Sequence, residues 1–70
     1  MTKFPELSHE RIVRALKKAG FTILREGKHT LMTDGRHLTV IPRHRVIKTK
    51  TLKSILEGAD MTLEQFRELL

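Results

Sequence analysis

Four histidines are the only side chains in this 70-residue sequence that are expected to titrate near neutral pH, so acid–base chemistry should involve them. His29 directly follows Gly27 and Lys28, in a stretch typical of a tight turn. Glycine lets a backbone or a phosphate approach closely, and the positive charges of Lys28 and Arg25 would attract a phosphodiester. His29 is therefore our candidate for proton transfer, and Gly27, Lys28 and Arg25 are candidates for holding phosphate.

A single histidine of this kind suits RNA as a substrate, because RNA carries its own nucleophile, the 2′-hydroxyl. Cleavage then needs a proton acceptor, a proton donor for the leaving oxygen and cations that stabilise the charge on phosphorus. No metal, cofactor or cysteine is required, and the chain has no cysteine. One well-placed proton-transfer group is worth ~10²–10⁴ in rate.

A second concentration of positive charge follows the last expected strand. We interpret it as a phosphate-binding edge, in which His44 is either a second proton-transfer group or an ordinary residue of a solvated loop. The residues assigned to this edge are Arg43, His44, Arg45, Lys48 and Lys50, with Lys53 continuing the positive surface.

The other two histidines are interpreted structurally. His9 lies among polar neighbours in the first turn of a helix and is expected at the surface, and His37 is expected to face outward or to pack beside Met32. A zinc ion held by His29, His37 and His44 is an alternative, but the spacing matches no known metal motif and no acidic fourth ligand lies nearby.

Composition also favours a polyanionic partner. The chain carries a formal charge of +6, and residues 11–53 hold twelve basic residues against two acidic ones. Such a segment attracts nucleic acid.

The length allows one small domain, expected to span 1–70. No apolar run exceeds two residues, so we expect no membrane span or signal peptide, and the absence of cysteine fits the cytoplasm.

The first helix has clear signals at both ends. Ser8 is a good N-cap, and Gly20 can supply the left-handed stop. Its apolar stripe is expected to be Ile12, Val13, Leu16 and Ala19.

Three strands are expected next, over 21–26, 29–33 and 36–42. Gly27-Lys28 suits a type II′ turn, and Asp34-Gly35 predicts a two-residue hairpin loop. That loop would pair Leu31 with Leu38 and His29 with Val40. Which face of the sheet is buried stays open, because Leu31 and Val40 lie on one face whereas Met32 and Ile41 lie on the opposite one. A bulge near Gly27 would resolve which of these apolar faces is buried.

Two further helices complete the chain. Thr49 is expected to cap a helix with an apolar stripe at Leu52, Ile55, Leu56 and Ala59, and Thr62 with Gln65 forms a capping-box pattern. The predicted fold is α+β, in the order α-β-β-β-α with a short C-terminal helix. Two main helices would cover one face of a three-stranded antiparallel sheet.

These segments, taken in order, resemble the HicA family of mRNA-interferase toxins from bacterial and archaeal toxin–antitoxin pairs. The resemblance covers nearly the whole chain and depends on the order and spacing of its pieces. They are IVRALKKAGF (12–21), GKH (27–29), DGR (34–36), VIPRH (40–44) and TLKSIL (51–56).

The resemblance implies a fold like a double-stranded-RNA-binding domain, a metal-independent endoribonuclease that cleaves mRNA, and a HicB-type antitoxin as partner. It places the family's catalytic histidine at His29 and the preceding glycine at Gly27, with Lys28 where the family has a small residue. The family's Pro-x-His element maps onto Pro42 and His44. The alternative function is a non-catalytic RNA-binding module of the same fold; a DNA-binding protein is disfavoured because no helix-turn-helix pattern is present.

An acidic partner is also expected on physical grounds. The central segment has an excess of ten positive charges, which repel one another. An acidic protein that covered this surface would neutralise it, stabilise the fold and occlude His29.

Overall fold

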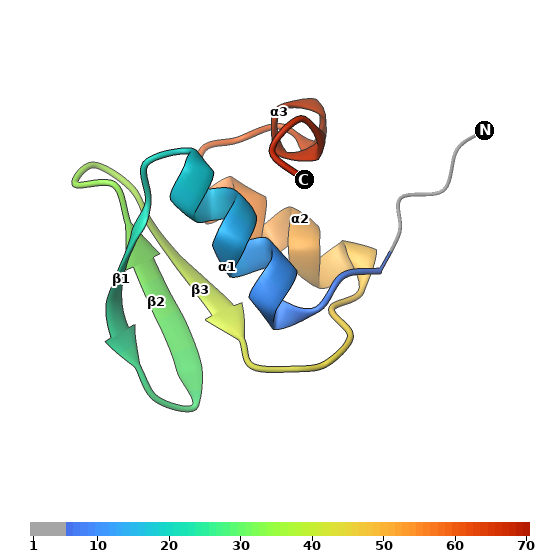
Figure 1. Ribbon diagram of the computed structural model, residues 1–70, viewed down its shortest axis with the longest axis horizontal. Coiled ribbons are helices and arrows are strands. Elements are labelled where there is room, and N and C mark those ends of the chain that lie inside the picture. Colours follow the sequence, from blue (N-terminus) through green and yellow to red (C-terminus); the bar gives the residue numbers. More distant parts are fainter. Residues whose placement is uncertain (1–5) are drawn as a thin grey trace.

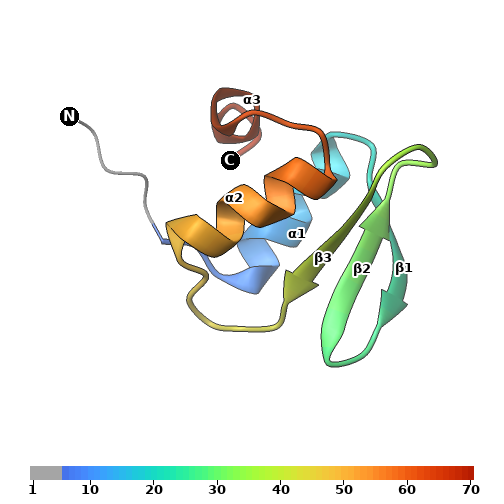
Figure 2. The same cartoon turned by 180° about the vertical axis from the view of Figure 1, so that it is seen from behind.

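The computed structural model describes residues 6–70, and its helices and strands follow the predicted order. The three strands form one antiparallel sheet in the order β1-β2-β3, with α1 and α2 on the same side of it (Figures 1 and 2). The α+β architecture is therefore confirmed. The elements are α1 (His9–Lys18), β1 (Thr22–Glu26), β2 (His29–Thr33), β3 (Leu38–Pro42), α2 (Thr49–Gly58) and α3 (Leu63–Arg67).

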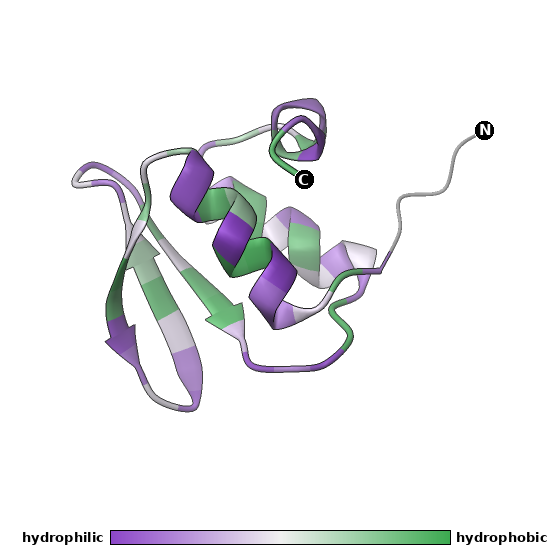
Figure 3. Ribbon diagram, viewed as in Figure 1, coloured by the Kyte–Doolittle hydropathy of each residue, from purple (hydrophilic) through white to green (hydrophobic). Residues whose placement is uncertain are grey.

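The ends of α1 are those that the sequence predicts. The Ser8 hydroxyl accepts a hydrogen bond from the Arg11 backbone N–H, and Gly20 has a φ of +96° just beyond the helix. Hydrophobic and hydrophilic residues alternate along the helix (Figure 3). One position of the predicted stripe is wrong: Ala19, the C-cap residue, is exposed, and Ala15 is buried instead.

The hairpin between β2 and β3 has a longer loop than predicted. The Asp34 carboxylate accepts hydrogen bonds from the backbone N–H groups of Arg36 (2.9 Å) and His37 (2.7 Å). These bonds hold residues 34–37 in the loop, so β3 begins at Leu38 rather than at residue 36.

The longer loop shifts the pairing of β2 and β3 by two residues. Leu31 pairs with Val40, not with Leu38, and His29 pairs with Pro42, not with Val40. A shift of two residues keeps every side chain on its predicted face, because side chains alternate with a period of two. The face that carries His29 and Leu31 is the outer face of the sheet, away from the helices.

The inner face of the sheet is the buried one. Met32 and Ile41 are fully buried there, together with Thr30 and Thr39. They pack against the apolar sides of the helices in a single core. Among residues 6–70, no helix combines the length and the apolar character that a membrane span requires.

A β-bulge lies inside β1 rather than near Gly27. The register shifts between Ile23 and Arg25, which leaves Leu24 unpaired and 62% exposed. Ile23 lies opposite Met32 and packs against the core, whereas Arg25, beyond the shift, lies opposite Leu31 on the outer face.

The two ends of α2 are defined by its N-cap residue and by a glycine that packs against the sheet. The predicted cap is one residue too late, because Lys48 is the N-cap and Thr49 is already helical. Gly58, at the other end, allows α2 to approach β3 closely: a Cβ there would lie 2.9 Å from the backbone oxygen of Leu38.

The last helix packs through one aromatic residue. Thr62 and Gln65 form the predicted capping box, with hydrogen bonds in both directions. This start directs Phe66 into the core, where it is fully buried.

The Asp34 loop should make the protein sensitive to acid. Backbone hydrogen bonds from Arg36 and His37 lower the pKa of Asp34 to about 2, from an ordinary value of 3.8. A carboxylate with a lowered folded-state pKa contributes stability that is present above pH ~4 and is lost as the pH falls toward ~2. We therefore expect Asp34→Asn to show a smaller loss of stability over this pH range, measured by urea denaturation. Glu57→Gln, an exposed substitution on α2, is the control; identical pH slopes in both variants would contradict the prediction.

Candidate active site

The turn between β1 and β2 presents His29. Glu26 pairs with Thr30, and the Gly27 N–H donates to the His29 carbonyl (3.1 Å), so the connection between these paired residues consists of Gly27, Lys28 and His29, the first residue of β2. The predicted type II′ turn is wrong, because it requires a positive φ at Gly27, and Gly27 does not have one. The bulge in β1 changes the register and makes this loop one residue longer than predicted.

The surface beside His29 is open. A Cβ placed on Gly27 would meet no atom within 4 Å, and the backbone there is in an ordinary conformation. Neither packing nor backbone strain therefore requires glycine at this position. Lys28 and His29 are both exposed, so the imidazole is accessible next to a cationic side chain.

Arg25 shares the outer face of the sheet with His29. Arg25 pairs with Leu31, which lies two residues beyond His29 on the same face of β2. Both side chains are exposed. Arg25, Lys28 and His29 therefore lie in the same hairpin.

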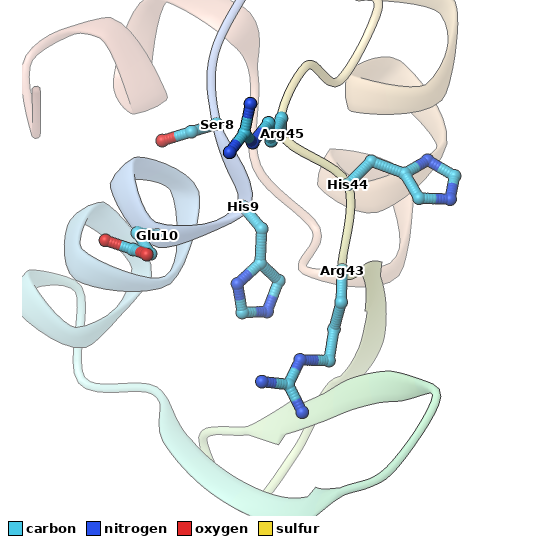
Figure 4. A pocket seen from close by; sticks show the side chains of 6 residues that line it. All are labelled: Ser8, His9, Glu10, Arg43, His44 and Arg45. Carbon is cyan, nitrogen blue, oxygen red and sulfur yellow. The ribbon is translucent and has the colours of Figure 1, made fainter.

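Arg43 reaches the same hairpin from the helix side. It follows Pro42, the partner of His29, and its Nη1 donates to the Gly27 carbonyl oxygen (3.4 Å). Figure 4 shows its guanidinium and the ring of His9 pointing into the same space. Arg43 therefore connects the loop before His29 to the start of α1.

His9 is not the surface residue that the sequence suggests. Its ring is half-buried, and its Nε2 lies 2.7 Å from the Thr30 hydroxyl. Burial, and then the charge of Arg43, lower the pKa of His9 below its ordinary value of 6.5. No local signal identifies this contact, because Thr30 is 21 residues away in the chain.

The remaining basic residues form a longer edge. The loop that carries Arg43, His44 and Arg45 is joined to α1 by a hydrogen bond from the His9 N–H to the His44 carbonyl (3.1 Å). The His44 ring points away from His9 (Figure 4), and Arg45 lines the same hollow as Ser8. Lys48 and Lys50 are exposed at the start of α2 and extend this edge away from the hairpin.

His37 is separated from the other candidates. It follows the far end of β2, roughly 13 Å along the strand from His29. Its ring contacts Asp34 (3.2 Å) and Asp60 (3.5 Å), so it joins the β2–β3 loop to the end of α2. His29 and His37 cannot share a metal ion, and the zinc alternative is wrong.

Comparison with known proteins places the chain in a family. Residues 10–61 match the family model described as the HicA toxin of bacterial toxin–antitoxin. The match includes Gly27, His29 and Arg43, begins one residue after His9 and ends before α3. No curated protein and no solved structure matches the chain. Because the match spans most of the sequence, the chain belongs to the HicA toxin family, which is the family that its motifs resemble.

Proposed function

We propose that this toxin is a metal-independent endoribonuclease that cleaves mRNA, with His29 as the proton-transfer residue. The observation that carries the proposal is the exposed imidazole on a glycine-containing loop with open space beside it. Lys28 supplies a positive charge from the same loop, and Arg43 supplies one through its hydrogen bond to Gly27. Proton acceptor and cations thus lie at one end of the sheet.

The reaction follows from these groups. His29, as neutral imidazole, accepts the proton of the ribose 2′-hydroxyl while the 2′-oxygen attacks phosphorus. The bond from phosphorus to the 5′-oxygen breaks, and that oxygen takes a proton from the imidazolium or from water. Lys28 and Arg43 stabilise the charge on the phosphoryl oxygens. The products are a 2′,3′-cyclic phosphate and a 5′-hydroxyl end.

The purified protein should therefore cut single-stranded RNA in the presence of EDTA and release fragments with 5′-hydroxyl ends. The alternative function, a non-catalytic RNA-binding module, predicts salt-dependent binding with the RNA left intact. One gel and one end-labelling reaction distinguish the two functions.

We also propose that a HicB-type antitoxin binds the outer face of the sheet. Leu38 and Val40 lie on this face with His29 and are 52% and 45% exposed, and Leu31 beside them is half-buried. Apolar side chains gathered on a surface often mark a protein interface. An acidic protein that covered this face would contact both the apolar residues and the cations around His29, and it would block access to the imidazole.

Val40→Glu tests this interface. We expect it to weaken antitoxin binding at least about tenfold, because a charge would be buried against an apolar partner surface. Val46→Glu is a matched control: Val46 is 54% exposed and lies in the loop before α2. Calorimetric titration with the protein encoded beside the toxin gene measures both affinities, and equal affinities for the two variants would place the interface elsewhere.

A further inference from the structure

A groove runs along α1 on the helix side of the sheet. It consists of two open hollows, of about 220 and about 400 Å³, which share His9, Glu10 and Arg43 among their lining residues. The larger hollow extends over Val13 toward Lys17 and is bounded on the other side by β1. We call the two hollows together the α1 groove.

The α1 groove is mainly cationic, with an apolar floor. Val13 and Ile23 line the larger hollow and provide apolar contact area of the kind that sugars and base edges can cover. His9, between the hollows, has a pKa that is lowered first by burial and then by the positive charge of Arg43. The charged side chains that line the groove are Arg14, Lys17, Arg43 and Arg45, against Glu10 and Glu26.

Two hydrogen bonds connect the groove to the loop of His29. Arg43 donates to the Gly27 carbonyl, and His9 bonds to Thr30, the residue after His29 in β2. Thr30 faces the helices whereas His29 faces outward, so groove and imidazole lie on opposite faces of one strand. A strand of RNA held at His29 would reach the groove by passing the end of the hairpin, where Gly27 leaves open space.

His9 can also bind a ligand directly. Its Nε2 forms a hydrogen bond with the Thr30 hydroxyl, and Nδ1, the other ring nitrogen, has no hydrogen-bond partner within residues 6–70. When the threonine hydroxyl donates to Nε2, the neutral ring carries its proton on Nδ1 and can donate to a phosphate oxygen. The groove thus offers a hydrogen-bond donor between two sets of cations.

We propose that the α1 groove is a second RNA subsite, which binds the sugar–phosphate backbone of nucleotides next to the scissile bond. The proposal rests on the proposed nuclease function and extends it: the substrate is a single strand several nucleotides long rather than a dinucleotide. Arg43 lies at the junction between the subsite and the loop of His29.

Lys17 and Lys18 provide a matched test. Both are exposed in the last turn of α1, but Lys17 lines the groove and Lys18 lies beside Leu69 and Leu70, outside it. Both variants are made in a His29→Ala background, which keeps the RNA intact. We expect Lys17→Glu to weaken binding of a labelled single-stranded oligonucleotide roughly five- to tenfold at low salt. The slope of the binding constant against salt concentration should fall by an amount that corresponds to about one phosphate contact. Lys18→Glu should weaken binding about twofold or less, through long-range charge alone.

The same pair of substitutions separates this inference from the nuclease function. With His29 intact, Lys17→Glu should raise KM for the oligonucleotide with little change in kcat, and it should not affect cleavage of a dinucleotide. Equal RNA affinities for the Lys17→Glu and Lys18→Glu variants would overturn the subsite. A protein that never cuts RNA but loses RNA affinity selectively with Lys17→Glu would support RNA binding in the α1 groove and refute the nuclease.

Discussion

Replacing His29 with alanine should reduce the rate of RNA cleavage about 10²- to 10⁴-fold and abolish toxicity in cells, because the proposed proton acceptor is lost. The exposed position of His29 means that the substitution removes little packing, so the unfolding midpoint should change little. Single-turnover cleavage by purified protein, together with growth after induction, measures both effects.

His37→Ala is the informative control for this experiment. It removes a histidine at the other end of β2, where the ring contacts Asp34 and Asp60. We expect a modest loss of stability and full cleavage activity at a temperature where the variant is folded. A His29→Ala protein that is folded, cuts RNA and stops growth like the parent would refute the catalytic assignment.

Replacing Phe66 with alanine should largely unfold the isolated protein. Phe66 is fully buried, and truncation of a buried phenylalanine costs about 3–5 kcal/mol. A core in a chain of this size supplies only ~3–5 kcal/mol in total. The cost therefore approaches the whole free energy of unfolding, although the short helix that carries Phe66 lies beyond the family match.

Thermal denaturation followed by circular dichroism tests this expectation. Leu24→Ala removes a large side chain that is 62% exposed and should leave the melting temperature within a few degrees of the parent. Saturating antitoxin should restore folding of the Phe66→Ala protein, because a ligand at ~100 times its Kd adds about 2.7 kcal/mol. A cooperative transition at the parental temperature would show that α3 does not stabilise the core.

Much of the fold was predictable because its signals are local. The Ser8 cap, the Gly20 stop and the Thr62–Gln65 capping box each act within a few residues, and all three are present in the structure. His29 stood out for the same reason: its glycine and its neighbouring lysine directly precede it, and it is the first residue of a predicted strand. Alternation along the strands also assigned His29 and Leu31 to the same face.

Two details of the hairpins were not predicted. The Asp34 carboxylate accepts hydrogen bonds from N–H groups two and three residues farther along the chain, and this local signal lengthened the loop of the second hairpin. A bulge at Leu24 shifted the register of the first hairpin. The strand pattern alone left both faces of the sheet possible, and only packing against the helices decided that Met32 and Ile41 face the core.

The sequence by itself determined the order of the elements, the positive charge of the middle segment and the candidate histidine. Only the tertiary structure decided that His9 bonds to Thr30 and that Arg43 bonds to Gly27. These pairs are 21 and 16 residues apart. Spatial contact between them arises when α1 and the β3–α2 loop pack around the hairpin, and no periodicity or turn signal encodes that contact.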